Sequence, residues 1–277
     1  MSDLGGAPLE VHWTAQTHQG RVRRTNEDSF LCLRFDQTDL TFLGKEGESP
    51  LNRHEFIFAV SDGMGGENAG DFASNDVIQS VTAIISRNYH QTASSKSHTE
   101  RERLQEFCQQ IHEHASKVSR YYEECKGMGA TLSLAWIDSG TLHVLHLGDS
   151  RIYHFPVDGG IVQLTEDHTV AGRLFRDGKI SEREARNHPY RNQLEKSIGC
   201  HSADVNPQIT SIPVQKGDRF LLCSDGITDG LWDHSLEKLI RTPPSYLKEL
   251  TPAEALVKEA MEASGRDNLT ALVVEIV

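Results

Sequence analysis

The sequence predicts an α+β fold in which antiparallel sheets are covered by helices on their outer faces. Three short apolar runs separated by tight turns have the pattern of an antiparallel meander. They cover residues 130–137, 141–147 and 151–155. Residues 67–89 and 100–124 each carry apolar side chains at helical spacing along one face. A further helix is predicted near the end of the chain, so helices flank the strands on both sides in sequence and are expected outside the sheets.

The remaining elements are predicted from the same apolar periodicity and from the polar and helix-capping residues between the apolar segments. Further strands are predicted at residues 12–17, 29–35, 56–60, 219–223 and 269–277. Polar loops are predicted at 36–54 and 91–99, and helical residues at 235–240. Residues 166–200 are polar and irregular apart from a capping box, Ser181 with Glu184, that predicts a short helix.

The last helix has clear start and stop signals. Thr251 is placed as its N-cap, Pro252 as its first residue and Glu254 as the partner in a capping box. Gly265 is placed at its end. No repeat or linker interrupts the chain, so a single domain over residues 1–277 is expected.

Composition and charge limit the class of protein. The apolar content of 37% and charged content of 25% are ordinary for a globular domain with a substantial core. A net charge of −12 argues against nucleic acid as a partner, because phosphate backbones are bound by basic surfaces. The five cysteines are odd in number and scattered, which indicates reduced thiols. Without a signal-like N-terminus or an apolar run of about 20 residues, no membrane association and a cytoplasmic location are expected.

Four aspartates stand at predicted strand ends. Asp62 and Asp225 each lie in a Ser-Asp-Gly sequence directly after an apolar run, Asp149 follows the run ending at Leu147, and Asp267 precedes the final run. Brought together, they form an oxygen-only acidic site suited to Mg²⁺ or Mn²⁺. Each aspartate taken singly has a second interpretation as a turn residue. For Asp149 this means capping its own turn or pairing with Arg151.

Two other polar clusters have open interpretations. Residues 20–28 place three arginines beside two acids, which fits a solvated charged turn or a bidentate grip on an anionic substrate. His112 and His114 lie on a predicted helix and are expected to be exposed residues rather than metal ligands.

These motifs, in their order, resemble the bacterial branch of the metal-dependent type 2C (PPM) Ser/Thr protein phosphatases. The matching blocks run through nearly the whole chain. They are Val22-Arg23 with Asn26-Glu27-Asp28, Asp62 to Gly66, Gly148 to Arg151, Asp167-His168-Thr169, Ser224-Asp225-Gly226 and Asp267 to Thr270. The resemblance implies a four-layer α/β/β/α sandwich with two central antiparallel sheets.

The resemblance also implies a metal centre. Asp62 matches the carboxylate that bridges two Mn²⁺ or Mg²⁺ ions, and the Gly63 carbonyl matches a further ligand. Asp225 and Asp267 match ligands of one of these ions. Asp149 with Asp225 matches a weaker third metal site of bacterial members.

Catalytic roles follow from the same resemblance. Arg23 matches the arginine that binds the substrate phosphate, and Glu27 and Asp28 match residues that act on metal-bound water. Residues 167–199 correspond to the flap beside the active site. Met64 stands where animal members have a histidine suspected as general acid, and Glu67 where bacterial relatives often have one, so the general acid is unassigned. His168 is a candidate for it, with a buried role in fixing the flap as the simpler interpretation.

The implied reaction is hydrolysis of phosphoserine and phosphothreonine in proteins, reversing Ser/Thr kinase signalling, by water activated between two metal ions. No Cys-x₅-Arg loop or Asp-x-Asp pair supplies a covalent nucleophile. Phosphorylated proteins are the expected partners, among them a Ser/Thr kinase and its substrates, and the protein is expected to be a monomer. The alternatives are a stress-response regulator that dephosphorylates one dedicated partner and an inactive member used as a scaffold.

Overall fold

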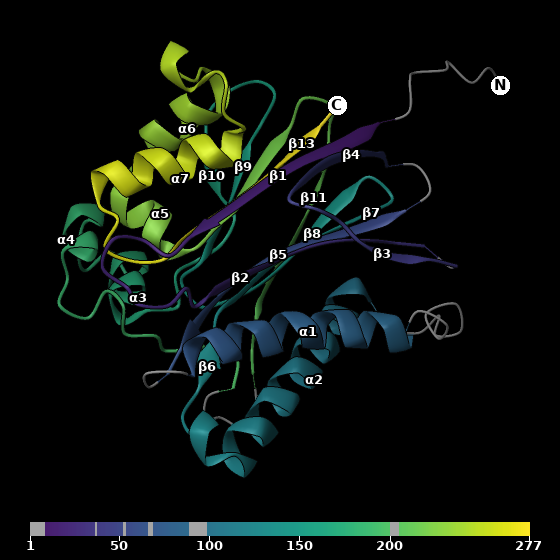
Figure 1. Cartoon of the computed structure of the whole chain (residues 1–277), viewed down its shortest axis with the longest axis vertical. Helices are drawn as coiled ribbons and strands as arrows, with labels where there is room; N and C mark the ends of the chain where they lie inside the picture. The colour runs from purple at the N-terminus through teal and green to yellow at the C-terminus, as the bar shows by residue number, and fades with distance from the viewer. Residues whose placement is uncertain (1–8, 37, 52–53, 66–68, 89–98, 200–204) are drawn as a thin grey trace.

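Two antiparallel sheets lie face to face and carry helices on their outer surfaces, so the chain forms a four-layer α/β/β/α sandwich (Figure 1). This computed structural model describes residues 9–36, 38–51, 54–65, 69–88, 99–199 and 205–277. The predicted loop 91–99 and Glu67 therefore lie largely or wholly outside the described residues.

The first sheet contains the N-terminal and C-terminal strands of the described chain as neighbours. In spatial order it consists of β10 (Val162–Gln163), β9 (Arg151–Phe155), β12 (Arg219–Cys223), β13 (Leu269–Ile276), β1 (Glu10–His18) and β4 (Glu46–Pro50). Its outer face is covered by α5 (Asp225–Gly230), α6 (Asp233–Arg241) and α7 (Pro252–Ala263).

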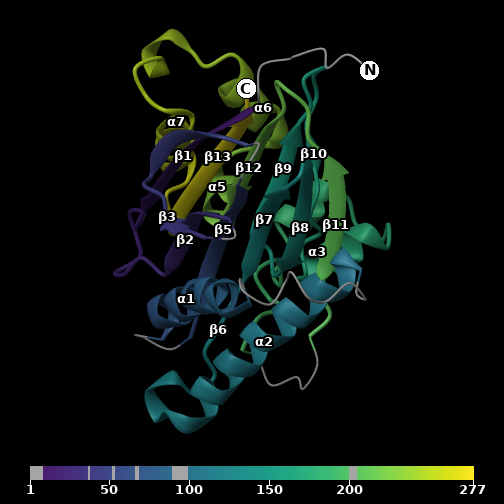
Figure 2. The same ribbon diagram turned by 90° about the vertical axis from the view of Figure 1, so that its right-hand side faces the viewer.

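The second sheet is covered by the two long helices α1 (Gly70–Asn88) and α2 (Glu100–Tyr121), as Figure 2 shows from the side. In spatial order it consists of β11 (Gln208–Pro213), β8 (Thr141–Leu147), β7 (Leu132–Asp138), β5 (Glu55–Met64), β2 (Asp28–Phe35) and β3 (Leu40–Phe42), with β6 (Gly129–Ala130) pairing with β5. The flap helices α3 (Val170–Arg176) and α4 (Glu182–Arg186) lie apart from these layers, at one end of the sandwich (Figure 1).

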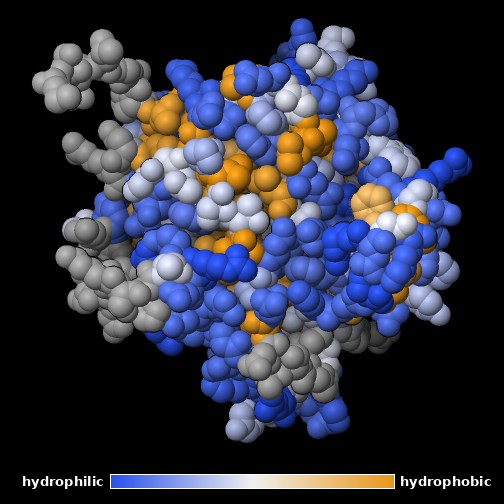
Figure 3. Space-filling model, turned by 180° about the vertical axis from the view of Figure 1, so that it is seen from behind, coloured by the Kyte–Doolittle hydropathy of each residue, from blue (hydrophilic) through white to orange (hydrophobic). Residues whose placement is uncertain are grey.

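The apolar core has three layers, one between each pair of structural layers. Trp13, Phe58 and Phe220 belong to the layer between the sheets, where the faces of both sheets exclude water. The other two layers lie under α1 and α2 and under α5 to α7. The outer surface seen from behind is mostly hydrophilic, with small separate hydrophobic patches (Figure 3).

Capping boxes begin three of the helices. The side chains of Thr99, Ser181 and Thr251 each accept a hydrogen bond from the backbone amide three residues on, and the glutamate at that position accepts one from the backbone amide of the cap residue. Each cap contributes roughly 1 kcal/mol. The predicted starts at Ser181 and Thr251 are confirmed, and Gly265, at φ +62°, follows the last helix as predicted.

The predicted meander is wrong in its third strand. β7 and β8 pair as expected, but β9 belongs to the other sheet, where Arg151 pairs with Cys223. The chain leaves the second sheet at Gly148, whose φ of +115° suits glycine. Strand periodicity identifies a strand but not its partner, so the crossing was not visible in the sequence.

Several other expectations need correction. The predicted loop 36–54 contains the short edge strands β3 and β4, and β11, α3 and α5 were not predicted. The second long helix ends at Tyr121, with a 3₁₀ turn at Glu123–Cys125. His112 is buried, 2% exposed, and bonded to Ser116 and the Gly199 amide, whereas His114 is exposed as expected.

Two bulk expectations can be compared with the structure. Four cysteines, Cys32, Cys108, Cys125 and Cys223, are buried free thiols, and Cys200 lies outside the described residues. Within the described ranges, no helix combines the length and the apolar character needed to span a bilayer.

Candidate metal centre and active site

The predicted site residues meet in one cleft of about 180 Å³ at the end of the sandwich. Seven of the eight line it: Arg23, Glu27, Asp62, Gly63, Asp149, Asp225 and Asp267. Both sheets contribute, since Asp62 lies on β5 while Asp225 and Asp267 stand beside the ends of β12 and β13. The eighth residue, Asp28, is buried directly behind them, opposite Asp62 in the β2–β5 register.

Asp62 lies within a strand, and the expectation that it ends one is wrong. β5 runs on to Met64 because β2 continues to pair with it on one side and β6 on the other. Thr131 fixes the Asp62 backbone, since its amide donates to the Asp62 carbonyl at 2.8 Å and its Oγ1 accepts from the Asp62 amide at 2.9 Å. The carboxylate is therefore presented from rigid sheet rather than from a loop.

Glycine is required where this strand meets α1. A Cβ on Gly63 would overlap the carbonyl of Gly70, and a Cβ on Gly70 would overlap the carboxylate of Glu27. The Gly63 amide also donates to the Glu27 carbonyl at 3.0 Å. This close packing places Glu27 and Gly63 side by side on the cleft wall.

The other two aspartates of the centre are held by a second close approach. A Cβ on Gly226 would overlap the carbonyl of Asn268, so the start of α5 packs directly on the segment before β13. Asn268 also anchors the arginine-rich loop, residues 20–28. Its side-chain nitrogen Nδ2 donates to the carbonyls of Gln19 and Thr25, and its Oδ1 accepts from the backbone amide of Glu27.

Asp149 lies where the chain crosses between the sheets. The alternative in which it pairs with Arg151 does not hold, since Arg151 donates through Nε and Nη2 to both oxygens of Asp167, at 2.8 and 2.6 Å, and through Nη1 to Tyr153. The Asp149 carboxylate lines the cleft instead.

The electrostatics of the cleft are those of crowded carboxylates. Burial, followed by repulsion from Asp28, Asp225, Asp149 and Asp267, raises the pKa of Asp62 well above its usual value. Burial and then Asp149 and Asp267 do the same for the pKa of Asp225. The pKa of Asp149 rises to about 7, chiefly through burial and then Asp167. Burial raises the pKa of Asp28 to about 6 against the lowering effect of hydrogen bonds from Ser224 and Thr270.

This donor set fits hard divalent cations. Oδ1 of Asp225 and Oδ1 of Asp28 are buried atoms that have no hydrogen-bond partner in the described part of the chain. Buried negative charge of this kind is costly unless a cation compensates it, and carboxylate and carbonyl oxygens are the ligands that Mg²⁺ and Mn²⁺ prefer.

The cleft carboxylates do not converge on a common metal position in this structure. Among the described residues, no three His, Cys, Asp or Glu side chains are gathered closely enough to hold a metal ion. At Asp267 the charge is met by Arg23, whose Nη2 donates to Oδ2 at 2.7 Å, while Arg23 Nη1 lies 3.9 Å from Glu27. Binding ions here therefore requires the side chains to converge, and the unpaired oxygen of Asp225 is available for that.

His168 is placed in the flap base rather than on the cleft wall. It is 5% exposed, its Nδ1 accepts from the Gly148 amide at 3.2 Å, and its ring stacks on His146 at 4.8 Å. Burial lowers the pKa of His168 to about 3. These contacts support the simpler interpretation, in which His168 fixes the flap.

Sequence reasoning missed several residues of the site. Thr131 and the flap residues Asn192 and Leu194 line the cleft, and Asn268 anchors the arginine-rich loop. Asn268 stands beside Asp267 in a quoted motif, so its position was visible but its role was not. Nothing local marks Asn192 or Leu194, because they reach the cleft through the fold of the flap.

A two-sheet sandwich whose end carries a cleft of buried carboxylates and an arginine defines the class as a domain built to hold divalent cations. The family model described as Protein phosphatase 2C matches residues 49–264. The serine/threonine phosphatase stp of Listeria monocytogenes is 30% identical over 266 residues, covering 96% of each chain. The chain therefore belongs to the protein phosphatase 2C family.

Solved structures agree with this assignment. The catalytic domain of serine threonine protein phosphatase PstP, in complex with two manganese ions, superposes with a TM-score of 0.74 at 26% identity, over 97% of this chain and 99% of that one. The fold is also that of the serine/threonine phosphatase Stp1 from Staphylococcus aureus, with a TM-score of 0.78 at 24% identity over 100% and 98% of the two chains.

Proposed function

We propose that this protein hydrolyses phosphoserine and phosphothreonine in other proteins, at a centre holding two Mn²⁺ or Mg²⁺ ions, and so reverses the action of a Ser/Thr kinase. The observation that carries the proposal is the convergence of Asp62, Asp225, Asp267 and Arg23 from both sheets on one cleft. The names of the relatives and the two manganese ions in PstP support the same reaction.

The residues divide into those that hold ions and those that act on the substrate. Asp62 would hold both ions, the Gly63 carbonyl would be a further ligand, and Asp225 and Asp267 would be ligands of one of the ions. When bound, the ions would lower the pKa of a water molecule, so that hydroxide is available near neutral pH to attack the phosphorus, and would offset charge on the phosphoryl group. Asp149 with Asp225 offers a third, weaker position.

Arg23 binds the phosphoryl oxygens of the substrate. The Arg23 side chain is 47% exposed, and one of its five donor hydrogens is engaged by Asp267, so donors remain for a phosphate. Glu27 lines the cleft and accepts or orients the proton of the attacking water. Asp28, which accepts hydrogen bonds from Ser224 and Thr270 at 2.7 Å each, would act on the same water from behind the aspartates.

Two alternatives to this function differ from it in substrate range or in activity. A phosphatase dedicated to one regulatory partner would use the same chemistry and differ in its substrate range. An inactive scaffold is disfavoured because all four cleft aspartates are present.

We place the protein in the cytoplasm, acting as a monomeric single catalytic domain on phosphoproteins.

The test is hydrolysis of p-nitrophenyl phosphate and of a phosphothreonine peptide, each with Mn²⁺ and with EDTA. Activity should vanish in EDTA and return with Mn²⁺. Asp62→Asn and Asp225→Asn should each abolish turnover with the fold retained, whereas Asp158→Asn, on an exposed turn, should leave it unchanged. Full activity in EDTA would contradict the two-metal reaction.

A further inference from the structure

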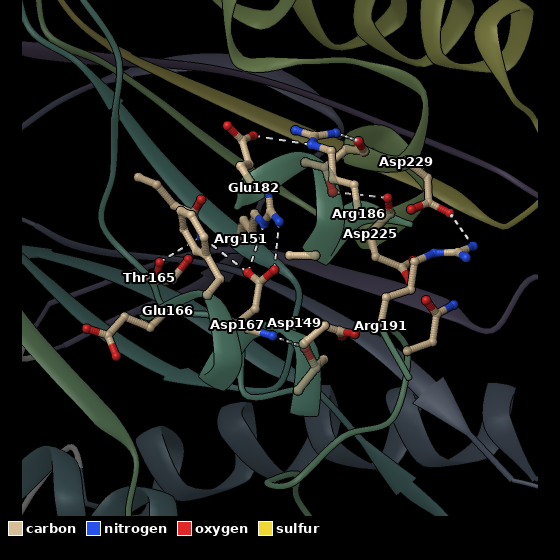
Figure 4. A pocket seen from close by; sticks show the side chains of 18 of the residues that line it. Asp149, Arg151, Thr165, Glu166, Asp167, Glu182, Arg186, Arg191, Asp225 and Asp229 are labelled. Carbon is tan, nitrogen blue, oxygen red and sulfur yellow. Dashed lines mark hydrogen bonds and ion pairs between the residues drawn. The ribbon is translucent and has the colours of Figure 1, made fainter. Parts of the chain in front are cut away.

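A second cavity adjoins the catalytic cleft. It measures about 340 Å³ and is lined by residues of the flap helices α3 and α4, of α5 and of the start of α6. Figure 4 shows ten of its lining residues labelled. Asp149, Asn192 and Asp225 line both spaces, so the two lie side by side and share part of their walls. We call this cavity the flap pocket and define it by Phe175, Glu182, Arg186, Asp229 and Asp233 around its sides and the Arg151–Asp167 pair within it.

The flap pocket is held in shape by contacts between the flap and the core. Arg186 of α4 donates through Nη1 to the Thr228 carbonyl at 2.6 Å, and its guanidinium lies 4.0 Å from the ring centre of Trp232. Arg191 of the flap lies 3.5 Å from Asp229 of α5. These contacts join the flap to the α5–α6 region, so the two walls of the pocket are held at a fixed separation.

Charge within the flap pocket is not balanced. Three arginines each have a carboxylate of their own: Arg151 with Asp167, Arg176 with Glu166, and Arg191 with Asp229. Arg186 is shared by two, since its Nε lies 3.3 Å from Glu182 and its Nη2 3.9 Å from Asp233. One carboxylate is therefore in excess at this place, besides Asp149 and Asp225 at the junction with the cleft.

Both carboxylates around Arg186 are open to solvent and to a ligand. The side chain of Asp233 is 42% exposed and that of Glu182 51%. The apolar part of the wall comes from Phe175, which is 46% exposed, and from Ala171 and Ala185. A long aliphatic stem ending in a positive charge matches this combination, because the stem can pack on Phe175 while the head reaches the acids.

We propose that the flap pocket binds a lysine or arginine side chain of the phosphoprotein substrate, a few residues from the phosphorylated residue, with Asp233 and Glu182 as its specificity-determining partners. This rests on the proposed function, since it needs a polypeptide substrate whose phosphoresidue occupies the adjoining cleft. An acidic side chain would be repelled by the excess carboxylate, and a short apolar one would form no ion pair with Asp233 or Glu182.

The experiment compares phosphothreonine peptides that differ at one flanking position, scanned over four residues on each side, with lysine, methionine or glutamate there. Methionine matches the length of lysine without its charge. At one position or more, kcat/KM should rank lysine above methionine above glutamate. The lysine advantage should be about fivefold to tenfold, the size expected of a partly exposed ion pair with an aromatic contact.

Charge variants assign the preference to the pocket. Asp233→Asn, which keeps an acceptor for the Tyr153 hydroxyl, and Glu182→Gln should each reduce the lysine advantage, and the double variant should remove it. Asp233→Lys should reverse the order toward glutamate. The matched controls Glu123→Gln and Glu123→Lys change a 91% exposed carboxylate near the end of α2 and should leave the ranking intact.

Hydrolysis of p-nitrophenyl phosphate separates this inference from the proposed function, because that substrate has no side chain to enter the pocket. Its turnover should be unchanged in the Asp233→Asn and Glu182→Gln variants. A flat ranking at every position, a preference for glutamate, or a lysine preference that survives the double variant would each overturn the pocket assignment. Failure of wild-type protein to hydrolyse any phosphate ester with Mn²⁺ would instead overturn the proposed function.

Discussion

Thr131 and Asp62 hold each other by hydrogen bonds in both directions: the Thr131 amide donates to the Asp62 carbonyl, and the Asp62 amide donates to Thr131 Oγ1. The same hydroxyl lies 2.7 Å from the Ser150 hydroxyl, next to Asp149. A Cβ on Gly148 would overlap the Thr131 methyl group. Thr131 thus fixes the backbone at Asp62 and packs against both neighbours of Asp149, so it links two cleft aspartates that come from different segments of the chain.

Thr131→Val should weaken Mn²⁺ binding several-fold while Thr131→Ser should not. Valine has the same shape but leaves the buried Asp62 amide without its acceptor, at a cost of roughly 1–3 kcal/mol. Serine keeps the hydroxyl and loses the methyl group. Isothermal titration with Mn²⁺ and the thermal unfolding midpoint measure both effects. Equal Mn²⁺ affinity in wild type and Thr131→Val would show that Thr131 does not position the aspartates.

Arg23→Ala should raise KM for phosphopeptides more than it lowers kcat, with a loss of at most several kcal/mol, the scale of charged hydrogen bonds to phosphate. Mn²⁺ affinity should not fall, because the substitution removes a competitor for Asp267. Arg21→Ala is the matched control, since Arg21 packs beside Gly265 and does not line the described cleft. Steady-state kinetics at saturating Mn²⁺ decide between them, and equal effects of the two substitutions would reassign the role.

Asp149→Ala should retain the two inner ions and the fold but lower kcat at high Mn²⁺ concentration. A third ion held by Asp149 and Asp225 would have few protein ligands and bind weakly. The measurement is a Mn²⁺ titration of activity, with metal content determined in parallel for both proteins. Unchanged kcat and stoichiometry at saturating Mn²⁺ would leave Asp149 as a residue that caps its own turn.

The metal-free protein should lose stability as pH rises from about 4 to about 7. Asp28, Asp62, Asp149 and Asp225 all have raised pKa values in the folded state, so folding takes up protons in this range and stability falls as they ionise. A shift of the Asp28 pKa from 3.8 to about 6 corresponds to about 3 kcal/mol.

Urea unfolding in EDTA across this pH range measures the effect. Asp28→Asn, which cannot ionise, should flatten the dependence, and saturating Mn²⁺ should reverse it by binding the ionised carboxylates. A metal-free protein that becomes more stable between pH 4 and pH 7 would show that burial and mutual repulsion do not raise the pKa values of these carboxylates.

The sequence by itself determined the local features of this protein. The apolar runs of β1, β2, β5, β12 and β13, the two long helices and the capping boxes at Ser181 and Thr251 appear where they were predicted. These depend on neighbours within a few residues along the chain, which is what hydrophobic period and cap chemistry report. The strand-associated aspartates and the family resemblance could be read in the same way.

Tertiary structure alone decided how those features combine. Whether β9 pairs with β8 or with β12, and so whether Asp149 reaches the cleft, depends on partners far away in sequence. The same holds for the Thr131–Asp62 bonds, the anchoring of the arginine-rich loop by Asn268 and the bridging of the flap to α5 through Arg186. These contacts join residues between 42 and 249 positions apart, over which local propensity carries no information about pairing.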